Sequence, residues 1–231
     1  MTKTNPSHIA KLALEHEKRS KNREVDTANQ WTKIDVSLQN AYHLAKCSIL
    51  GLHHKSILHQ DLTDKEILKF VLIHTSFIRG IPLTEFAIKA GYYAQAHNLI
   101  KAEIESVAAA GETISGHRKD GATPSVKKLE EPVRKMYGFI NKVAHPGGLA
   151  SVSSLVSESN KGENQLSTFP IFYLNIAQSL FSLHVGMVID FTRAVANWLQ
   201  FIGDKTDLST EAEFNGKAAI ALNKYLNREK A

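Results

Sequence analysis

Residues 171–202 have the sequence IFYLNIAQSLFSLHVGMVIDFTRAVANWLQFI, and this stretch decides the fold class. Large apolar side chains occur around almost the whole circumference of a helix with 3.6 residues per turn, which is typical of a helix buried on all sides. Polar residues such as Asn175, His184 and Asp190 interrupt the run of about 20 apolar residues that a membrane span requires. The stretch therefore predicts the long central helix of a bundle, with a membrane-associated helix as the alternative.

The remainder of the chain has the same helical periodicity. Apolar residues recur at spacings of three and four through residues 31–52, and Thr63 with Glu66 forms a capping box that opens another helix before Gly80 and Pro82. Six prolines and 13 glycines in 231 residues are too few for the turns of an all-β protein. We therefore predict an all-α, up-and-down bundle of about six to seven helices.

Caps, glycines and prolines predict the remaining helix boundaries. One helix is expected over about 7–21, and Gly91 marks either a kink or a true break in the helix that follows Pro82. Five positions are expected to open helices: Ser7, Thr84, Thr123, Thr168 and Thr210. Pro132 is expected either to start a new helix or to kink the helix that begins at Thr123.

The chain is expected to form a single bundle domain, 24–231, preceded by a basic helical arm, 1–23. The arm has six basic residues against two acidic ones. A serine-rich stretch at about 146–168 predicts a flexible loop. The single cysteine, Cys47, is expected to be a small core residue and cannot form an intramolecular disulfide, so a cytoplasmic location is the default.

Basic residues are also concentrated in a second stretch. The chain has 28 Lys and Arg against 23 Asp and Glu, and residues 117–145 alone contain seven basic residues against three acidic ones. Lysines and arginines without interleaved aromatic residues favour phosphate contacts over base contacts. The side chains that we expect to track phosphates are Arg118, Lys119, Lys127, Lys128, Arg134 and Lys142. A solvated helix face is the alternative interpretation.

A polar stripe runs beside the apolar face of the helix that ends near His145. Arg134, Gly138, Asn141 and His145 are spaced by four, three and four residues, so they fall on one side of a helix. Gly138 leaves a bare patch of backbone, while Asn141 and His145 can share one ligand. The stripe predicts an anion or RNA site; in the alternative, Asn141 and His145 only tie the helix end to the following loop.

Two segments together resemble the HEPN-like (higher-eukaryote and prokaryote nucleotide-binding) superfamily. Residues 91–96, GYYAQA, followed by Leu99, Lys101 and Glu105, resemble its second core helix, and residues 141–146, NKVAHP, are similar to its Arg-Asn-x-x-Ala-His element. The resemblance covers about residues 64–200. It implies a four- or five-helix bundle, frequently dimeric, in a superfamily that includes metal-independent ribonucleases of toxin and antiviral systems and non-catalytic RNA-binding modules.

This chain departs from the family pattern at both arginine positions. The family's catalytic arginine would fall at Ile140, and the arginine of the partner helix is Lys101 here. Metal-free cleavage needs a base, a donor and a positive group for the developing phosphorane charge. His145 would be the base or acid and Asn141 would orient it, while Glu105 would pair with Lys101 or hold one tautomer of His145. Three side chains could supply the positive charge: Lys101, Lys142 and Arg134.

The expected partners are RNA or a nucleotide and a second copy of the chain, with an antitoxin or regulatory protein as a further possibility. We expect no metal, because the clustered residues His53, His54 and His59 lack a carboxylate at ligand spacing. We expect no cofactor, because the sequence has no Walker glycine loop and no dinucleotide fingerprint, and we expect no membrane partner. The alternative function is a catalytically inert protein-interaction or regulatory module.

Overall fold

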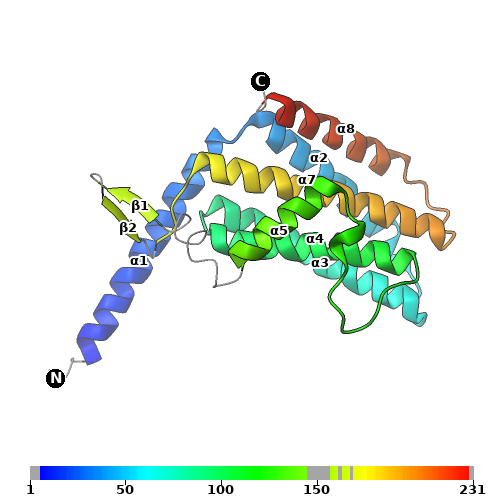
Figure 1. Ribbon diagram of the computed structural model, residues 1–231, viewed down its shortest axis with the longest axis horizontal. Coiled ribbons are helices and arrows are strands. Elements are labelled where there is room, and N and C mark those ends of the chain that lie inside the picture. The colour runs from blue at the N-terminus through cyan, green and yellow to red at the C-terminus, as the bar shows by residue number, and fades with distance from the viewer. Residues whose placement is uncertain (1–5, 145–156, 161–162, 167–168, 229–231) are drawn as a thin grey trace.

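The computed structural model describes residues 6–144, 157–160, 163–166 and 169–228. This part of the chain contains seven α-helices, three short 3-10 helices and one two-stranded antiparallel hairpin, which confirms the predicted all-α bundle (Figure 1). The elements are α1 (Pro6–Gln30), η1 (Trp31–Lys33), α2 (Val36–Lys55), η2 (Ile57–His59), α3 (Lys65–Lys89), α4 (Tyr93–Ile114), η3 (Val126–Lys128), α5 (Glu131–Ala144), β1 (Ser157–Asn160), β2 (Glu163–Leu166), α7 (Leu174–Phe201) and α8 (Ser209–Arg228).

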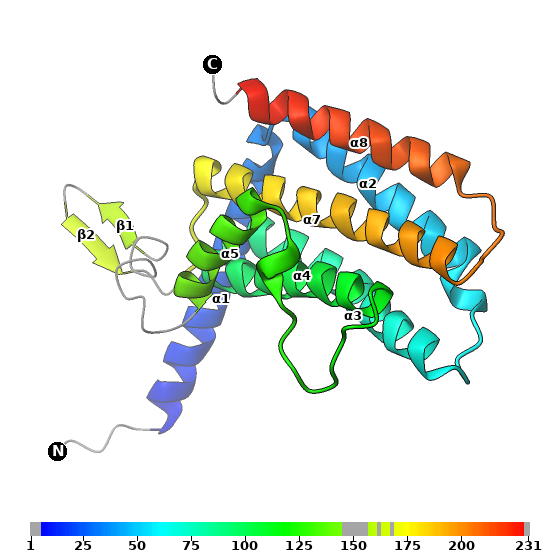
Figure 2. The ribbon, with the colours of Figure 1, turned by 45° about the vertical axis from the view of Figure 1, so that its right-hand side comes forward.

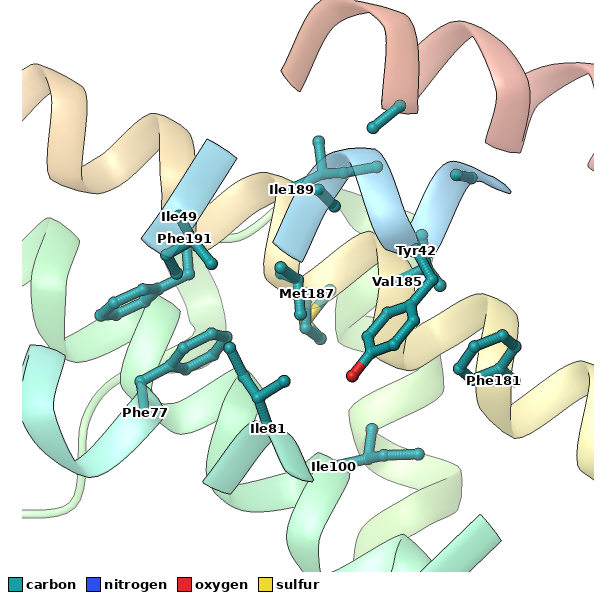
Figure 3. Packing of buried hydrophobic residues seen from close by; sticks show 14 of the residues in the cluster. Tyr42, Ile49, Phe77, Ile81, Ile100, Phe181, Val185, Met187, Ile189 and Phe191 are labelled. Carbon is teal, nitrogen blue, oxygen red and sulfur yellow. The ribbon is translucent and has the colours of Figure 1, made fainter. Parts of the chain in front are cut away.

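Helix α7 is the predicted central helix. It packs against α2, α3, α4 and α8, and α5 lies on the outside against α4 (Figure 2). Aromatic side chains join α7 to α3: Phe191 stacks on Phe77 with 3.9 Å between ring centroids (Figure 3). Trp198 stacks on Phe70 at 4.1 Å. A helix that is apolar on nearly every side thus packs against four neighbouring helices.

Helix α3 continues through Pro82, so the predicted break at Gly80 and Pro82 is wrong. A proline inside a helix lacks the N–H that would reach the carbonyl four residues earlier. Ile81, Thr84 and Ile88 nevertheless stay buried along one face of α3. Burial of this face therefore outweighs the lost hydrogen bond, and the helix expected to begin near Thr84 does not start there.

Gly91 is a true break between α3 and α4. Its φ of +80° is a conformation that L side chains rarely adopt, and an added Cβ would lie 2.4 Å from the carbonyl oxygen of Ile171. The close approach of the segment before α7 therefore requires a glycine here. The sequence left a kink and a break open, and this packing decides between them.

Several helix starts differ from the prediction by a few residues. The cap of α3 is Asp64 instead of Thr63, because the Asp64 carboxylate accepts from the backbone N–H groups of Glu66 and Ile67. No α-helix starts at Thr123; residues 126–128 form η3, and α5 begins at Glu131 with Pro132 in its first turn. Helix α8 starts at Ser209, one residue before the predicted position. Thr168 lies outside the described residues.

Two expectations about α2 are also corrected, one on where the helix starts and one on Cys47. The periodic stretch beginning at Trp31 is not one helix: η1 comes first, and Asp35 then caps α2 by accepting from the N–H of Ser37 at 2.7 Å. Cys47 is exposed, so the prediction that it belongs to the core is wrong. Its position on α2 lies off the face that carries Ala45 and Ile49 into the core.

Helix α1 is longer than the predicted 7–21 and runs to Gln30. Its last turns join the bundle, where the buried Thr27 hydroxyl donates to the carbonyl of Ala90 at 3.1 Å. The preceding turns project away from the bundle (Figure 1), and Ile9, Leu12 and Leu14 are each more than half exposed. The serine-rich stretch contains β1 and β2, a hairpin that the sequence did not predict; the flexibility assigned to 146–168 stays a prediction.

Candidate functional site

Two predicted site residues of α4, Lys101 and Glu105, meet a tyrosine of α5 where the two helices pack. The Tyr137 hydroxyl of α5 donates to the Glu105 carboxylate of α4 at 2.7 Å, and the same carboxylate oxygen lies 3.9 Å from Lys101 Nζ. Burial, followed by the hydrogen bond to Glu105, raises the pKa of Tyr137 to about 12. The hydroxyl of Tyr137 is therefore neutral near pH 7 and acts as a donor. We call Lys101, Glu105 and Tyr137 the α4–α5 cluster.

Tyr137 was not predicted as a site residue, because its spacing places it on the apolar face of the helix that ends near His145. Its ring does pack against the core, and only its hydroxyl reaches Glu105. The signal was present in the spacing: Tyr137 precedes Asn141 by four residues, so both lie on the same side of α5. A tyrosine at a stripe edge can place a polar tip beside a predicted site.

The polar stripe of α5 lies beside this cluster. Arg134 and Gly138 are exposed, Asn141 is half-buried, and no neighbour from the described part of the chain lies within 4 Å of a Cβ added to Gly138. The bare backbone patch predicted at Gly138 is therefore present. His145, the residue to which the sequence assigned the proton transfers, lies outside the described residues.

Ile140 occupies the position at which the resemblance would place a catalytic arginine. Its side chain is 1% exposed and belongs to the bundle core. A guanidinium at this point of α5 would have to be buried or would have to displace the helix. At this position of α5, Ile140 therefore has a packing role in the core.

The six predicted phosphate-binding cations fall into two groups. Five are exposed, and none of these forms an ion pair with another residue of the described ranges: Lys119, Lys127, Lys128, Arg134 and Lys142. Arg118 differs, because its guanidinium donates to the carbonyl of Ala122 at 2.8 Å and lies 3.6 Å from the Glu112 carboxylate. Arg118 therefore holds the loop 115–125 in shape.

A second polar cluster lies inside the bundle and was not predicted. Glu103 of α4 is 3% exposed; it accepts a hydrogen bond from the Thr84 hydroxyl of α3 at 2.7 Å and shares one with His184 Nδ1 of α7 at 2.8 Å. The Tyr42 hydroxyl donates to Glu85 at 2.7 Å, and the Tyr42 ring lies 5.4 Å from that of His184. The hydrogen bonds of Glu103 connect α3, α4 and α7, and the ring contact of Tyr42 with His184 places α2 beside them.

The two histidines at the end of α2 make ring contacts with each other and with a histidine of α3. His53 stacks on the fully buried His74 of α3, with 5.2 Å between ring centroids and 13° between planes, and His54 lies edge-on to His53. His59 is exposed. Among the described residues, no group of three or more His, Cys, Asp or Glu side chains is arranged to hold a metal ion.

No family model, no curated protein and no solved structure matches this chain. Two of its described helices, α3 and α7, are long and apolar enough to cross a membrane by length and composition alone. Half of the α7 window is buried inside the bundle, as expected for a core helix. The proposal for the function of this chain therefore depends on the residues and contacts described above.

Proposed function

We propose that this chain binds single-stranded RNA, mainly through its phosphates, along a surface formed by the loop 115–125, η3 and α5. We call this the basic surface. The observation that carries the proposal is that Lys119, Lys127, Lys128, Arg134 and Lys142 are exposed and form no ion pair with other described residues. Unpaired cations release counterions when they meet phosphates, and this release supplies most of the affinity of sequence-independent binding.

The α4–α5 cluster adds directional groups to this charge. Lys101 supplies a half-buried cation, and Asn141 supplies an amide one turn beyond Tyr137 along α5. The Tyr137 hydroxyl donates its hydrogen to Glu105, and its oxygen is suited to accept from a ribose hydroxyl. Hydroxyl and amide groups hydrogen-bond phosphate and ribose oxygens and so fix the register of a bound strand. The exposed backbone at Gly138 lets a strand approach α5 closely.

Reversing two charges of the basic surface should weaken RNA binding. For Lys127→Glu combined with Lys128→Glu, we expect the affinity for a mixed-sequence single-stranded RNA to fall by about tenfold or more, and the slope of log K against log salt to decrease by about 1.4, since each phosphate contact contributes about 0.7. Fluorescence anisotropy at several salt concentrations measures both quantities.

The matched control reverses two exposed lysines elsewhere, Lys205 and Lys224, and so removes the same net charge. We expect its affinity to stay within about twofold of the wild type. An equal loss in both double variants would mean that net charge alone is responsible. A folded wild-type chain without salt-sensitive RNA binding would contradict the proposed function.

We also propose that the bound RNA is cleaved without a metal, with His145 as general base or acid and Asn141 beside it. The support from the described residues is the group of Lys101, Glu105 and Asn141 on the adjoining helices, which supplies charge and orientation to that end of α5. In EDTA, we expect wild-type protein to shorten a labelled RNA and His145→Ala to lower the rate by about 100-fold. Cleavage that is unchanged in His145→Ala would exclude this mechanism.

The second candidate function is an inert protein-interaction or regulatory module, and α1 favours it. A projecting helix with exposed Ile9, Leu12 and Leu14 offers apolar side chains to a protein partner. Absence of RNA binding in the experiment above would favour this candidate. The homodimer, the antitoxin-like partner and the cytoplasmic location stay predictions.

A further inference from the structure

A cavity of about 520 Å³ lies at the end of the bundle where α3 begins and where α4 and α7 end. Its volume is within the range of small-molecule sites, about 300–1,000 Å³. Six residues give it its chemical character: Trp198 and Phe201 from α7, Asp64, Glu66 and Lys69 from the start of α3, and Arg118 from the loop 115–125. We propose that this cavity receives one unpaired nucleobase of the bound RNA, an inference that rests on the proposed function.

The aromatic wall of the cavity is the first support. Trp198 is 2% exposed and is held by its stacking on Phe70, whereas Phe201, at the last residue of α7, is 68% exposed. An exposed phenyl ring at a cavity wall is unfavourable in water and offers a flat surface to a planar ligand. Stacking on aromatic side chains is a common way in which proteins bind the bases of single-stranded RNA.

The mixed charge of the lining is the second support, because it selects a neutral heterocycle over a bare anion. Asp64 and Glu66 face the same cavity as Lys69 and Arg118, so a free phosphate would meet two carboxylates. Asp64 uses Oδ1 to cap α3, and Glu66 uses Oε1 to bind Lys69 at 2.7 Å. Their second oxygens are suited to accept from an exocyclic amine, as on adenine or cytosine.

Continuity with the basic surface is the third support. Arg118 belongs to the cavity wall and is followed directly by the exposed Lys119 in the same loop, and η3 with Lys127 and Lys128 comes next along the chain. The contacts of Arg118 with Ala122 and Glu112 keep this loop beside the cavity. A strand whose phosphates lie along Lys119 therefore has a neighbouring base within reach of Phe201.

The test compares a 12-nucleotide oligoadenylate with an abasic 12-mer of the same charge. We expect wild-type protein to bind the oligoadenylate at least fivefold more tightly, and Phe201→Ala to lose this preference while its affinity for the abasic strand and its salt slope stay unchanged. Phe86→Ala is the matched control, since Phe86 is a 55% exposed phenylalanine near the other end of α3, and it should keep the preference.

A second measurement separates the cavity from the RNA function. The chain has two tryptophans, so in a Trp31→Phe background the fluorescence reports Trp198 in the cavity wall. We expect adenosine to quench it, and Phe201→Ala to abolish the quenching. Equal affinity for both strands, or a preference that survives Phe201→Ala, would overturn the base pocket and leave the RNA function standing. Quenching without any RNA binding would overturn the RNA function and leave the cavity as a nucleoside site.

Discussion

We expect the free energy of unfolding to decrease by about 2 kcal/mol between pH 7 and pH 5 because of one side chain, His74. The substitution His74→Phe should remove this decrease. The His74 ring is fully buried, stacks on His53, and has no hydrogen-bond partner for either nitrogen among the described residues. Burial, followed by the charge of His53, lowers the pKa of His74 to about 3.

The direction of the effect follows from where the proton binds. A histidine in the unfolded chain has a pKa near 6.5, so it binds a proton below that pH. In the folded chain His74 binds the proton only near pH 3. The free energy of unfolding therefore decreases by about 1.4 kcal/mol for each unit by which the pH is lowered within this window. Burial also lowers the pKa of His53, which acts in the same direction.

Urea unfolding of wild type and His74→Phe at pH 7 and pH 5 measures this term. The variant should be more stable at both values, since two unpaired buried nitrogens are replaced by carbon, and its loss between the two pH values should be smaller by about 2 kcal/mol. His59→Gln, a change at an exposed histidine, is the control and should keep the wild-type loss. A His74→Phe protein with the same pH dependence as wild type would contradict this prediction.

Removing the Glu103 carboxylate should destabilise the bundle by about 3–5 kcal/mol, the range for breaking a buried pair from one side. Glu103→Ala leaves the buried Thr84 hydroxyl and the buried His184 Nδ1 without their acceptor. Each stranded group contributes about 1–3 kcal/mol to that loss. Urea unfolding at pH 7 gives the value.

Two further variants define the cause. Glu103→Gln has nearly the same shape and retains one oxygen acceptor, so we expect a smaller loss of about 1–2 kcal/mol. Asn98→Ala, on the exposed side of the same helix, should change stability by no more than about 0.5 kcal/mol. A loss below about 1 kcal/mol in Glu103→Ala would show that the network is relaxed by water or by neighbouring groups.

The sequence predicted those features of the fold that depend on periodicity along one segment. The all-round apolar character of 171–202 was sufficient to place α7 at the centre, and its observed bounds are Leu174–Phe201. Local rules failed where packing overrides them, as at Pro82, where the buried face of α3 continues on both sides of the proline. The break at Gly91 depended on Ile171, 80 residues away, which no local rule could supply.

The candidate site shows the same limit. Lys101 and Glu105 could be paired from their spacing of four, and the structure shows that pair. Glu103 lies two residues from Glu105 and therefore points to a different side of α4, but its partner His184 is 81 residues further along the chain. Phe201 could not be singled out among ten phenylalanines without the neighbours that line its cavity.

The two ends of helix α1 differ in how much the bundle constrains their sequence. Its bundle-side end is fixed by Thr27, while the side chains of Ile9, Leu12 and Leu14 are exposed and the Glu17–Lys21 ion pair stabilises the helix locally. Substitutions in these outer turns therefore leave the folding equilibrium of the bundle almost unchanged. The outer turns of α1 can therefore change in sequence more freely than the buried residues of the bundle.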